Sequence, residues 1–500
     1  MKLFLLLSVI CSFFISPAQA KTATEVQAMA ESALQNMQDK AILQGISIKR
    51  QGPLLVEDGN GFFAITLPNL KIITADKIII DLGITSINAT ETAKDNIWEL
   101  RMALATPIRF SNGLGQPVME VHLPTQNVNI LWHEKANIFT SFFAKFSQVS
   151  AIDFQRNTTM NADEILIESS LDTPNFAYFE EQKNLLSQWN TRKASPDFNM
   201  NDEDITRLET LFAHYIGNFA KGRNLKIDMQ KVHIAEASVD AQKLDKSITI
   251  NRLLFDQGLT QDNASNSGDL VGNFAITGIQ SSNGQVVPDF IKASYLLKDM
   301  PYKEVTDLLR ASLKEAYFQN LMGQYPNSNQ TSTALISAQI KQEKEQKLTV
   351  LKQAAATRNT QLVAQLDADK KDAFGIGLRL DAKAAPTAAG GTGLLDLNFI
   401  NFDNFKKLLF EQAKSADTVN AEQSLQIGLS VIENLGLKST TADGAPKMTF
   451  RFQLGEDGQV MMNNMNIQML MALAMPAIAT LQSLNAPLDE TTPTTTQPSK

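Results

Sequence analysis

Between residues 61 and 132, apolar and polar residues alternate in five short runs. The runs cover residues 61–67, 70–84, 97–104, 117–123 and 127–132, and turn signals such as Asp58-Gly59-Asn60-Gly61 and Asn112-Gly113 separate them. A period of two places successive side chains on opposite faces of a strand. Because no helical pattern lies between these runs, they predict an antiparallel meander and not a doubly wound parallel sheet.

The alternation resumes at residues 225–229, 232–241, 247–255 and 272–279, after a predicted helical insertion over 201–219. A first helix is predicted over 24–41, with one apolar face. Pro301 is a suitable start for another helix that continues through Tyr317. A polar segment, 327–371, is expected to be mostly surface helix, and two helices over 402–416 and 420–436 precede the last hairpin. The fold class expected is α+β: an extended, mainly antiparallel sheet with helical insertions packed on it, and an elongated shape.

The first 20 residues have the pattern of a secretory signal peptide. Lys2 supplies the positive start, residues 3–15 form an apolar run, and Pro17-Ala18-Gln19-Ala20 is a small-residue cleavage site. The run is too short to span a membrane stably as a helix. We therefore expect cleavage after Ala20 and a periplasmic location. The alternative is anchoring to the inner membrane by an uncleaved signal.

Removal of the signal leaves no cysteine, because Cys11 is the only one in the chain. Disulfides, thiol catalysis and thiolate metal sites are thereby excluded, and the hydrophobic core must hold the fold. The remaining chain has 44 Lys and Arg against 53 Asp and Glu, a formal net charge of −9. This acidic balance, without a basic cluster, argues against a nucleic-acid partner.

Searches for catalytic motifs find no phosphate-binding loop, no nucleophile elbow and no pair of histidines four residues apart. The dipeptide His133-Glu134 beside Trp132 fits either a base with its orienting group or a polar strand end. Three carboxylates at Asp202-Glu203-Asp204 are best explained by favourable charge at a helix start. No catalytic, cofactor-binding or metal-ligating residue is predicted, and no cofactor is expected.

The last hairpin is the clearest in the sequence. Residues 448–454 alternate strictly, Gly455-Glu456-Asp457-Gly458 forms the turn, and residues 459–463 return, so Met461 and Met462 lie on opposite faces. From Met465 to Leu484 the residues are apolar nearly all round, which predicts a terminal helix. The candidates for closing a groove or the core are Met465, Ile467, Leu470, Met471, Leu473 and Ile478.

The segment FRFQLGEDGQVMMNNMNIQMLMALAMPAI resembles the C-terminal end of the YdgA-like family of exported bacterial proteins, a domain of unknown function. That family also has a strand, a turn with glycine, a returning strand that ends near Asn-Gly, and an apolar end rich in Met, Ala and Pro. Here Asn464 occupies the position of the usual glycine. The resemblance implies an exported protein with a β-rich body and helical insertions, and it implies no catalytic residues.

These observations divide the chain into a signal peptide (1–20), a first helix and antiparallel sheet with a helical insertion (21–300), a helical segment with closing helices, strands and hairpin (301–487), and a disordered tail (488–500). We expect a non-enzymatic periplasmic protein of the cell envelope, either a scaffold or a carrier of an apolar or lipid-like ligand. Its partners would be that ligand or envelope proteins, with membrane contact at most peripheral. The alternatives are a hydrolase of envelope glycans or esters that uses carboxylates or His133 as its base, and copper binding by Met462, Met465 and Met469.

Overall fold

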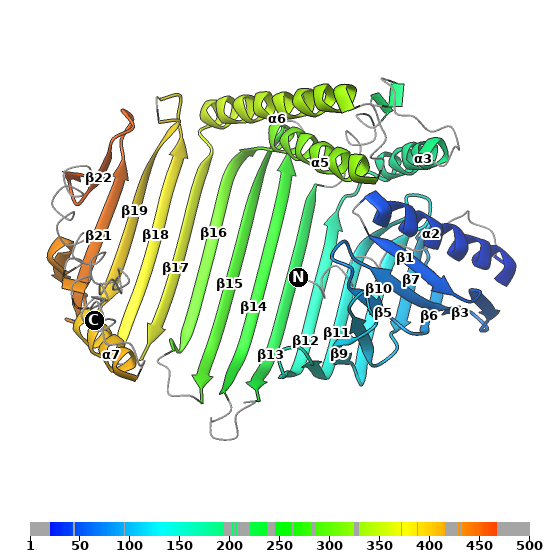
Figure 1. The fold of residues 1–500 in the computed structure, drawn as a ribbon, viewed down its shortest axis with the longest axis horizontal. Coiled ribbons are helices and arrows are strands. Elements are labelled where there is room, and N and C mark those ends of the chain that lie inside the picture. Colours follow the sequence, from blue (N-terminus) through cyan, green and yellow to red (C-terminus); the bar gives the residue numbers. More distant parts are fainter. Residues whose placement is uncertain are drawn as a thin grey trace, which may run out of the picture.

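A computed structural model describes residues 21–43, 46–94, 96–193, 221–237, 246–262, 265–282, 287–324, 330–371, 373–387, 389–415 and 433–467, with a few single positions between 203 and 210 and between 426 and 430. The fold is dominated by one antiparallel sheet (Figure 1). Residues 1–20 and 468–500 lie outside this range, so the signal peptide and the tail stay predictions.

Long strands that follow one another in the chain build most of the sheet. Each pairs with the next in antiparallel register, as predicted. β16 also pairs with β17, so the predicted regions 21–300 and 301–487 share this sheet. The strands are β11 (Ile138–Asp153), β12 (Thr158–Asp172), β13 (Gly222–Glu236), β14 (Lys246–Asp262), β15 (Ser267–Ser281), β16 (Phe290–Pro301), β17 (Gln361–Lys370), β18 (Phe374–Ala384), β19 (Gly391–Ile400) and β21 (Pro446–Leu454).

At β11 the sheet divides into two arms. Residues 138–147 of β11 pair with β10 (Thr125–His133), which continues to β7 (Ile97–Ala103), β6 (Thr85–Glu91), β3 (Phe63–Leu67) and β2 (Leu55–Asp58). Residues 150–153 pair with β9 (Pro117–His122), which continues to β8 (Ile108–Ser111), β5 (Ile79–Asp81), β4 (Asn69–Ile73) and β1 (Ser47–Gln51). One long strand therefore supports two short sheets.

The two arms and helix α2 (Ala23–Leu43) enclose the main hydrophobic core. We call this region, with β11 and β12, the closed end. A capping box starts the helix: the Thr22 N–H donates to Glu25 Oε2 at 2.7 Å, and the Glu25 N–H donates to Thr22 Oγ1 at 3.3 Å. The predicted apolar face of this helix is buried in full, which confirms the helical periodicity; it consists of Val26, Met29, Ala30, Ala33, Leu34 and Met37.

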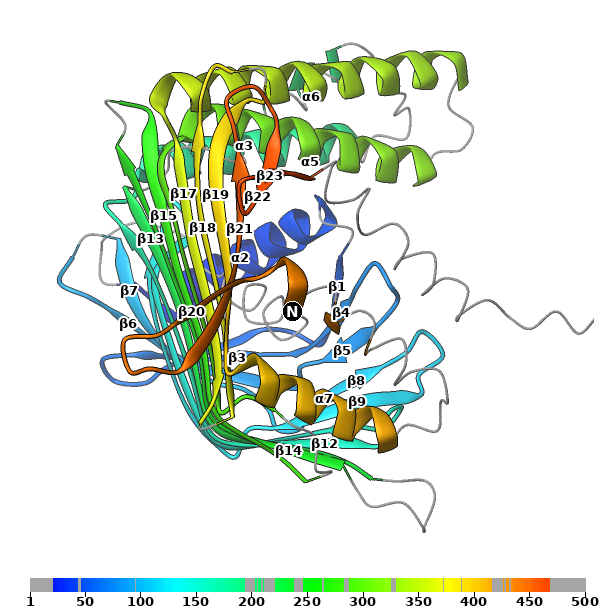
Figure 2. The same cartoon turned by 90° about the vertical axis from the view of Figure 1, so that its left-hand side faces the viewer.

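The remaining helices lie on one side of the long sheet (Figure 2). α3 (Phe176–Lys193), α5 (Tyr302–Gln324) and α6 (Gln330–Arg358) lie along one end of the strands, and α7 (Phe402–Ser415) lies toward the other. Two ion pairs join α5 to α6, Lys314–Glu343 and Lys344–Glu315, both at 2.8 Å. The helix beginning after Pro301 is confirmed. The helix predicted through residue 371 ends at Arg358, because the alternating residues 361–370 form β17.

A row of irregular positions crosses β11 to β15 without any shift of register. At this row two residues, and not one, separate successive residues of the buried face. Three strands of the row have positive φ angles, 56° at Gln148, 47° at Lys231 and 64° at Gly278. A Cβ at Gly278 would lie 2.2 Å from the Asn251 side chain, so glycine is required there. The alternation of faces is therefore offset by one residue in all five strands together.

The last hairpin forms as predicted from β21 and β22 (Val460–Met462), while β20 (Leu437–Thr440) pairs with the other end of β21. The helix predicted from Met465 is wrong at its start. Asn463 and Asn464 have φ of 49° and 67°, so they make a two-residue turn that pairs Met462 with Met465 in β23 (Met465–Asn466). Asparagine tolerates this left-handed conformation, in which glycine is more usual.

Candidate functional site

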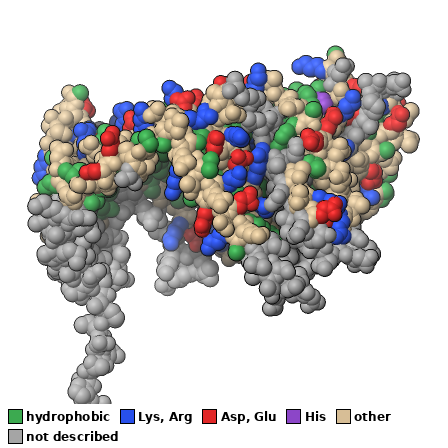
Figure 3. All heavy atoms as spheres, turned by 90° about the horizontal axis from the view of Figure 1, so that it is seen from above, with side chains coloured by type: hydrophobic (Ala, Val, Ile, Leu, Met, Phe, Trp, Pro, Cys, Tyr) green, Lys and Arg blue, Asp and Glu red, His purple; other side chains and the backbone are tan. Residues whose placement is uncertain are grey.

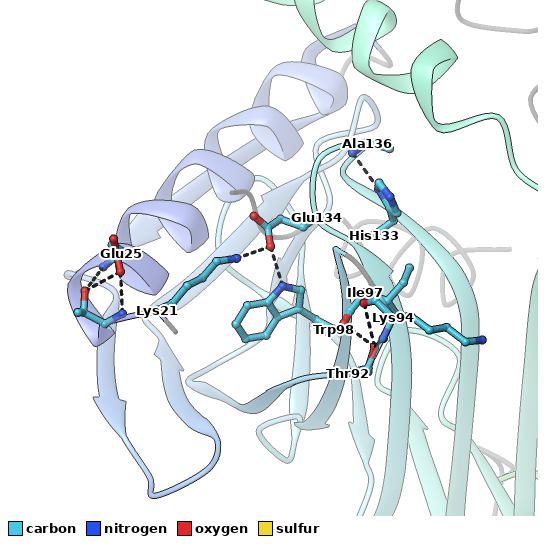
Figure 4. A network of polar contacts seen from close by, with 10 residues as sticks. Lys21, Glu25, Thr92, Lys94, Ile97, Trp98, His133, Glu134 and Ala136 are labelled. Carbon is cyan, nitrogen blue, oxygen red and sulfur yellow. Dashed lines mark hydrogen bonds and ion pairs between the residues drawn. The ribbon is translucent and has the colours of Figure 1, made fainter. Parts of the chain in front are cut away.

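Glu134 lies in a buried polar network at the closed end (Figure 4). Its Oε2 accepts a hydrogen bond from Trp98 Nε1 at 2.8 Å and forms an ion pair with Lys21 Nζ. The Lys21 ammonium also lies 4.7 Å from the centroid of the Trp98 ring. The Lys21 and Glu134 side chains are 4% and 1% exposed. This arrangement fastens the segment before α2 to the turn between β10 and β11.

His133 makes different contacts from its neighbour Glu134. Its ring stacks on Phe176 of α3, with 3.6 Å between the centroids, and its Nδ1 accepts a hydrogen bond from the Ala136 N–H at 3.1 Å. Burial lowers the pKa of His133 below its usual 6.5, although Glu180 and Glu134 act in the opposite direction. The two residues of the dipeptide thus hold separate elements, and these contacts do not bring them together as a base and its orienting group.

The methionines of the last hairpin lie in different environments. Met462 is buried in a second hydrophobic cluster with Met448, Phe450 and Phe402, whereas its cross-strand partner Met465 is 41% exposed. Ile467 is half-buried. The copper candidate Met469 and the remaining predicted closure residues, Leu470, Met471, Leu473 and Ile478, lie outside the described residues.

A continuous apolar face runs across the long sheet. Because directly paired residues share a face, the register carries the buried face of β11 and β12 onto every later strand. Its polar members on β14 to β19 are Gln257, Gln261, Ser281 and Tyr295, and its charged residues Lys246 and Lys370 lie at strand ends. We call the following residues the apolar face: Ile248, Ile250, Leu253, Phe255, Leu259, Leu270, Phe274, Ile276, Ile279, Ile291, Ala293, Leu297, Leu362, Ala364, Leu366, Ala368, Ile376, Leu378, Leu380, Ala382, Leu395, Leu397 and Phe399.

Coverage of this face differs along the sheet. The helices α2, α3, α5, α6 and α7 all lie on the side that it faces (Figure 2). At the far end, the aromatic rings of α7 pack on Leu397 and Phe399. In between, most of its residues are half-buried, and Ile248 and Leu366 are 40% and 37% exposed. Among the described residues, the middle of the sheet therefore presents an uncharged surface that is covered only in part.

The opposite face of the same strands is charged. Arg252 and Asp228 form a bidentate pair at 2.9 and 2.6 Å, and Arg451 and Asp396 form another at 2.8 and 2.9 Å. The arginine in each pair lowers the pKa of its carboxyl partner. Charges of both signs are also interspersed over the end of the molecule that carries α5 and α6 (Figure 3). The same strands therefore present apolar side chains on one face of the sheet and charged side chains on the other.

The described residues contain neither a candidate membrane-spanning helix nor a candidate metal site. None of the helices in this part of the chain is long and apolar enough to cross a membrane. No group of three or more His, Cys, Asp and Glu side chains is placed to hold a metal ion within the same residues. Comparison of the chain with protein-family models, curated proteins and solved structures finds no match. The YdgA-like resemblance stays a prediction.

Proposed function

We propose that this chain is a non-enzymatic α+β protein of the bacterial periplasm that carries an apolar or lipid-like ligand on the apolar face. The observation that carries the proposal is the absence of charge over β14 to β19 of that face, except at strand ends, on strands whose other face is charged. A half-buried apolar surface of this extent is unfavourable in water unless something covers it. The predicted export signal and the YdgA-like hairpin support a place in the envelope.

The dimensions of the face suit an acyl chain. Six strands about 4.8 Å apart span roughly 24 Å, and ten residues along a strand add about 34 Å. The hydrocarbon core of a bilayer is about 30 Å thick, so one leaflet accounts for about 15 Å. An acyl chain therefore fits on the face in either direction.

The direct test is native mass spectrometry and lipid extraction of protein purified from the periplasm under gentle conditions. The proposal expects a bound amphiphile or hydrocarbon of defined mass. Protein that is consistently empty, and that takes up no neutral apolar dye such as Nile red, would contradict it.

A matched pair of variants locates the ligand. Leu366→Asp places a charge in the middle of the apolar face, whereas Val271→Asp places the same charge on the opposite face at a similar exposure, 42% against 37%. Both sites are partly exposed, so both variants should fold. We expect Leu366→Asp to weaken Nile red binding about tenfold or more, because the ligand would have to desolvate a carboxylate. Val271→Asp should bind normally, and equal effects of the two variants would remove the assignment to this face.

A further inference from the structure

A partly buried cation lies where the apolar face meets the helices. Arg223 is the second residue of β13. It pairs with Leu171 of β12 and Leu259 of β14, so it shares the buried face with both leucines. Arginine rarely lies on an apolar face unless polar groups accept hydrogen bonds from its guanidinium. Here those groups come from the helices.

The Arg223 guanidinium donates a hydrogen bond from Nη2 to the Tyr302 hydroxyl at 2.8 Å, where α5 begins. Burial lowers the pKa of Arg223, and burial also raises the pKa values of Tyr302 and Tyr178. The tyrosines are therefore neutral at physiological pH. Arg310 of α5 lies close enough to lower the pKa of both hydroxyls.

Two acidic groups lie beside the other members of this cluster. Asp307 accepts a hydrogen bond from Arg310 at 2.9 Å, and Glu181 lies near Tyr178. The hydroxyls of Tyr302 and Tyr178 both act on the Arg223 cation. A tyrosine hydroxyl both accepts and donates hydrogen bonds, so it can contact a guanidinium and an anion together.

A buried amide completes the cluster. Gln261 follows Leu259 on the same face of β14, beside Tyr302, and is 8% exposed. Its side chain forms a hydrogen bond with the Tyr302 hydroxyl. An amide both donates and accepts hydrogen bonds, so Gln261 can contact a polar ligand atom while it holds Tyr302.

We propose that Arg223, Tyr302, Tyr178 and Gln261 bind the anionic head group, a carboxylate or phosphate, of an amphiphile whose apolar chain lies on the apolar face. This inference rests on the proposed carrier function and adds the chemical class of the ligand. A guanidinium matches the planar geometry of a carboxylate or phosphate. The uncharged face that begins at Leu259 and Leu270 then continues from the head group toward the middle of the sheet.

The test compares decanoate, decyl phosphate, decanol and decylammonium as competitors of Nile red on the full chain. The chains are equal, so differences in affinity report the head group. The wild type should bind the two anions about tenfold or more tighter than decylammonium, since a hydrogen-bonded charge contributes this much. If the cation binds as tightly as the anions, the head-group site is wrong; if none of the four displaces the dye, the carrier function fails as well.

Variants separate the residues. Arg223→Met should reduce the preference for the anions about tenfold and leave decanol binding unchanged, while Arg223→Lys should keep part of it. Arg379→Met is the matched control, because Arg379 is an exposed arginine on the charged face of β18. An unchanged preference in folded Arg223→Met or Arg223→Lys protein would overturn the assignment. Inorganic phosphate that competes as strongly as decyl phosphate would instead identify a site for a free anion and overturn the amphiphile.

Discussion

The closed end and the long meander differ in how they cover the apolar surface of their strands. In both, alternate residues of each strand build an apolar surface. At the closed end, two arms and α2 bury that surface completely, and Trp98, Trp132 and Ile87 are at most 1% exposed. Along β14 to β18, one sheet presents the surface and helices cover its margins, so residues such as Leu366 stay more than a third exposed. The same alternation therefore yields a core in one region and a candidate binding face in the other.

The comparison separates stability from function. Buried apolar area and the Lys21–Glu134 pair hold the closed end, so substitutions there should mainly affect folding. Partly exposed residues of the apolar face should contribute less to the free energy of folding and more to the binding of a ligand. Substitutions that change stability without changing binding, or binding without changing stability, test this division between the two regions.

The largest expected loss of stability follows Glu134→Gln. The substitution leaves the Lys21 ammonium buried without its carboxylate, and breaking a buried pair costs about 3–5 kcal/mol of unfolding free energy. Urea denaturation followed by tryptophan fluorescence measures the loss at the closed end, because Trp98 and Trp132 lie there. The double variant with Lys21→Met should recover part of the loss, and a double variant as unstable as the sum of both single variants would contradict the pairing.

A second prediction compares two leucines. Leu100→Ala at the closed end, where Leu100 is 1% exposed, should cost about 2–5 kcal/mol, since the substitution loses transfer energy and leaves a cavity. Leu378→Ala on the apolar face, where the residue is half-buried, should cost at most about half as much. Urea denaturation followed by circular dichroism compares them, and equal losses would show that the meander is as fully packed as the closed end.

The smallest expected effect is a dependence of stability on pH. Because the folded pKa of His133 is below its unfolded value of 6.5, the unfolded chain binds more protons between these two values. The contribution of His133 is therefore complete above pH 6.5 and decreases as the pH falls through that window. His133→Phe should keep the stacking on Phe176 and flatten the curve between about pH 5 and 7. A variant with an unchanged slope would show that other groups control it.

Local patterns in the sequence predict much of the fold. Strict alternation gives the last hairpin, and 3–4 spacing gives the buried face of α2, since both depend only on neighbours in the chain. The alternation also gives the antiparallel meander. In contrast, β11 and β12, the strands that join both regions, are not predicted. In β11 the apolar Phe143 follows the buried Phe142, and the alternation is offset at Gln148; in β12 the apolar Leu166 lies between the buried Ile165 and Ile167.

The candidate face depends on information between strands. In β14, Ile248 and Ile250 are two residues apart, but Leu253 follows after three, which obscures a period of two. The offset in β14 can be recognised only from the structure, where the neighbouring strands β13 and β15 have the same one-residue offset beside it. Arg223 is another case, because its sequence neighbours are polar and its partners Tyr302 and Tyr178 lie far along the chain. Long-range pairing, and not propensity, places these residues.

The ends of the sheet bear on how proteins of this design can change in size. In the described residues, the outer edge of β21 is occupied by two short strands, β20 and β22, while the arms end in β1 and β2 of five and four residues. Short, charged edge strands such as β1, with Lys49 and Arg50, discourage further pairing with other chains. Both edges of the sheet thus end in short strands, and the strands between them form a simple meander. Inserting or deleting one hairpin in this meander would change the width of the sheet by about 9.6 Å and leave both edges intact.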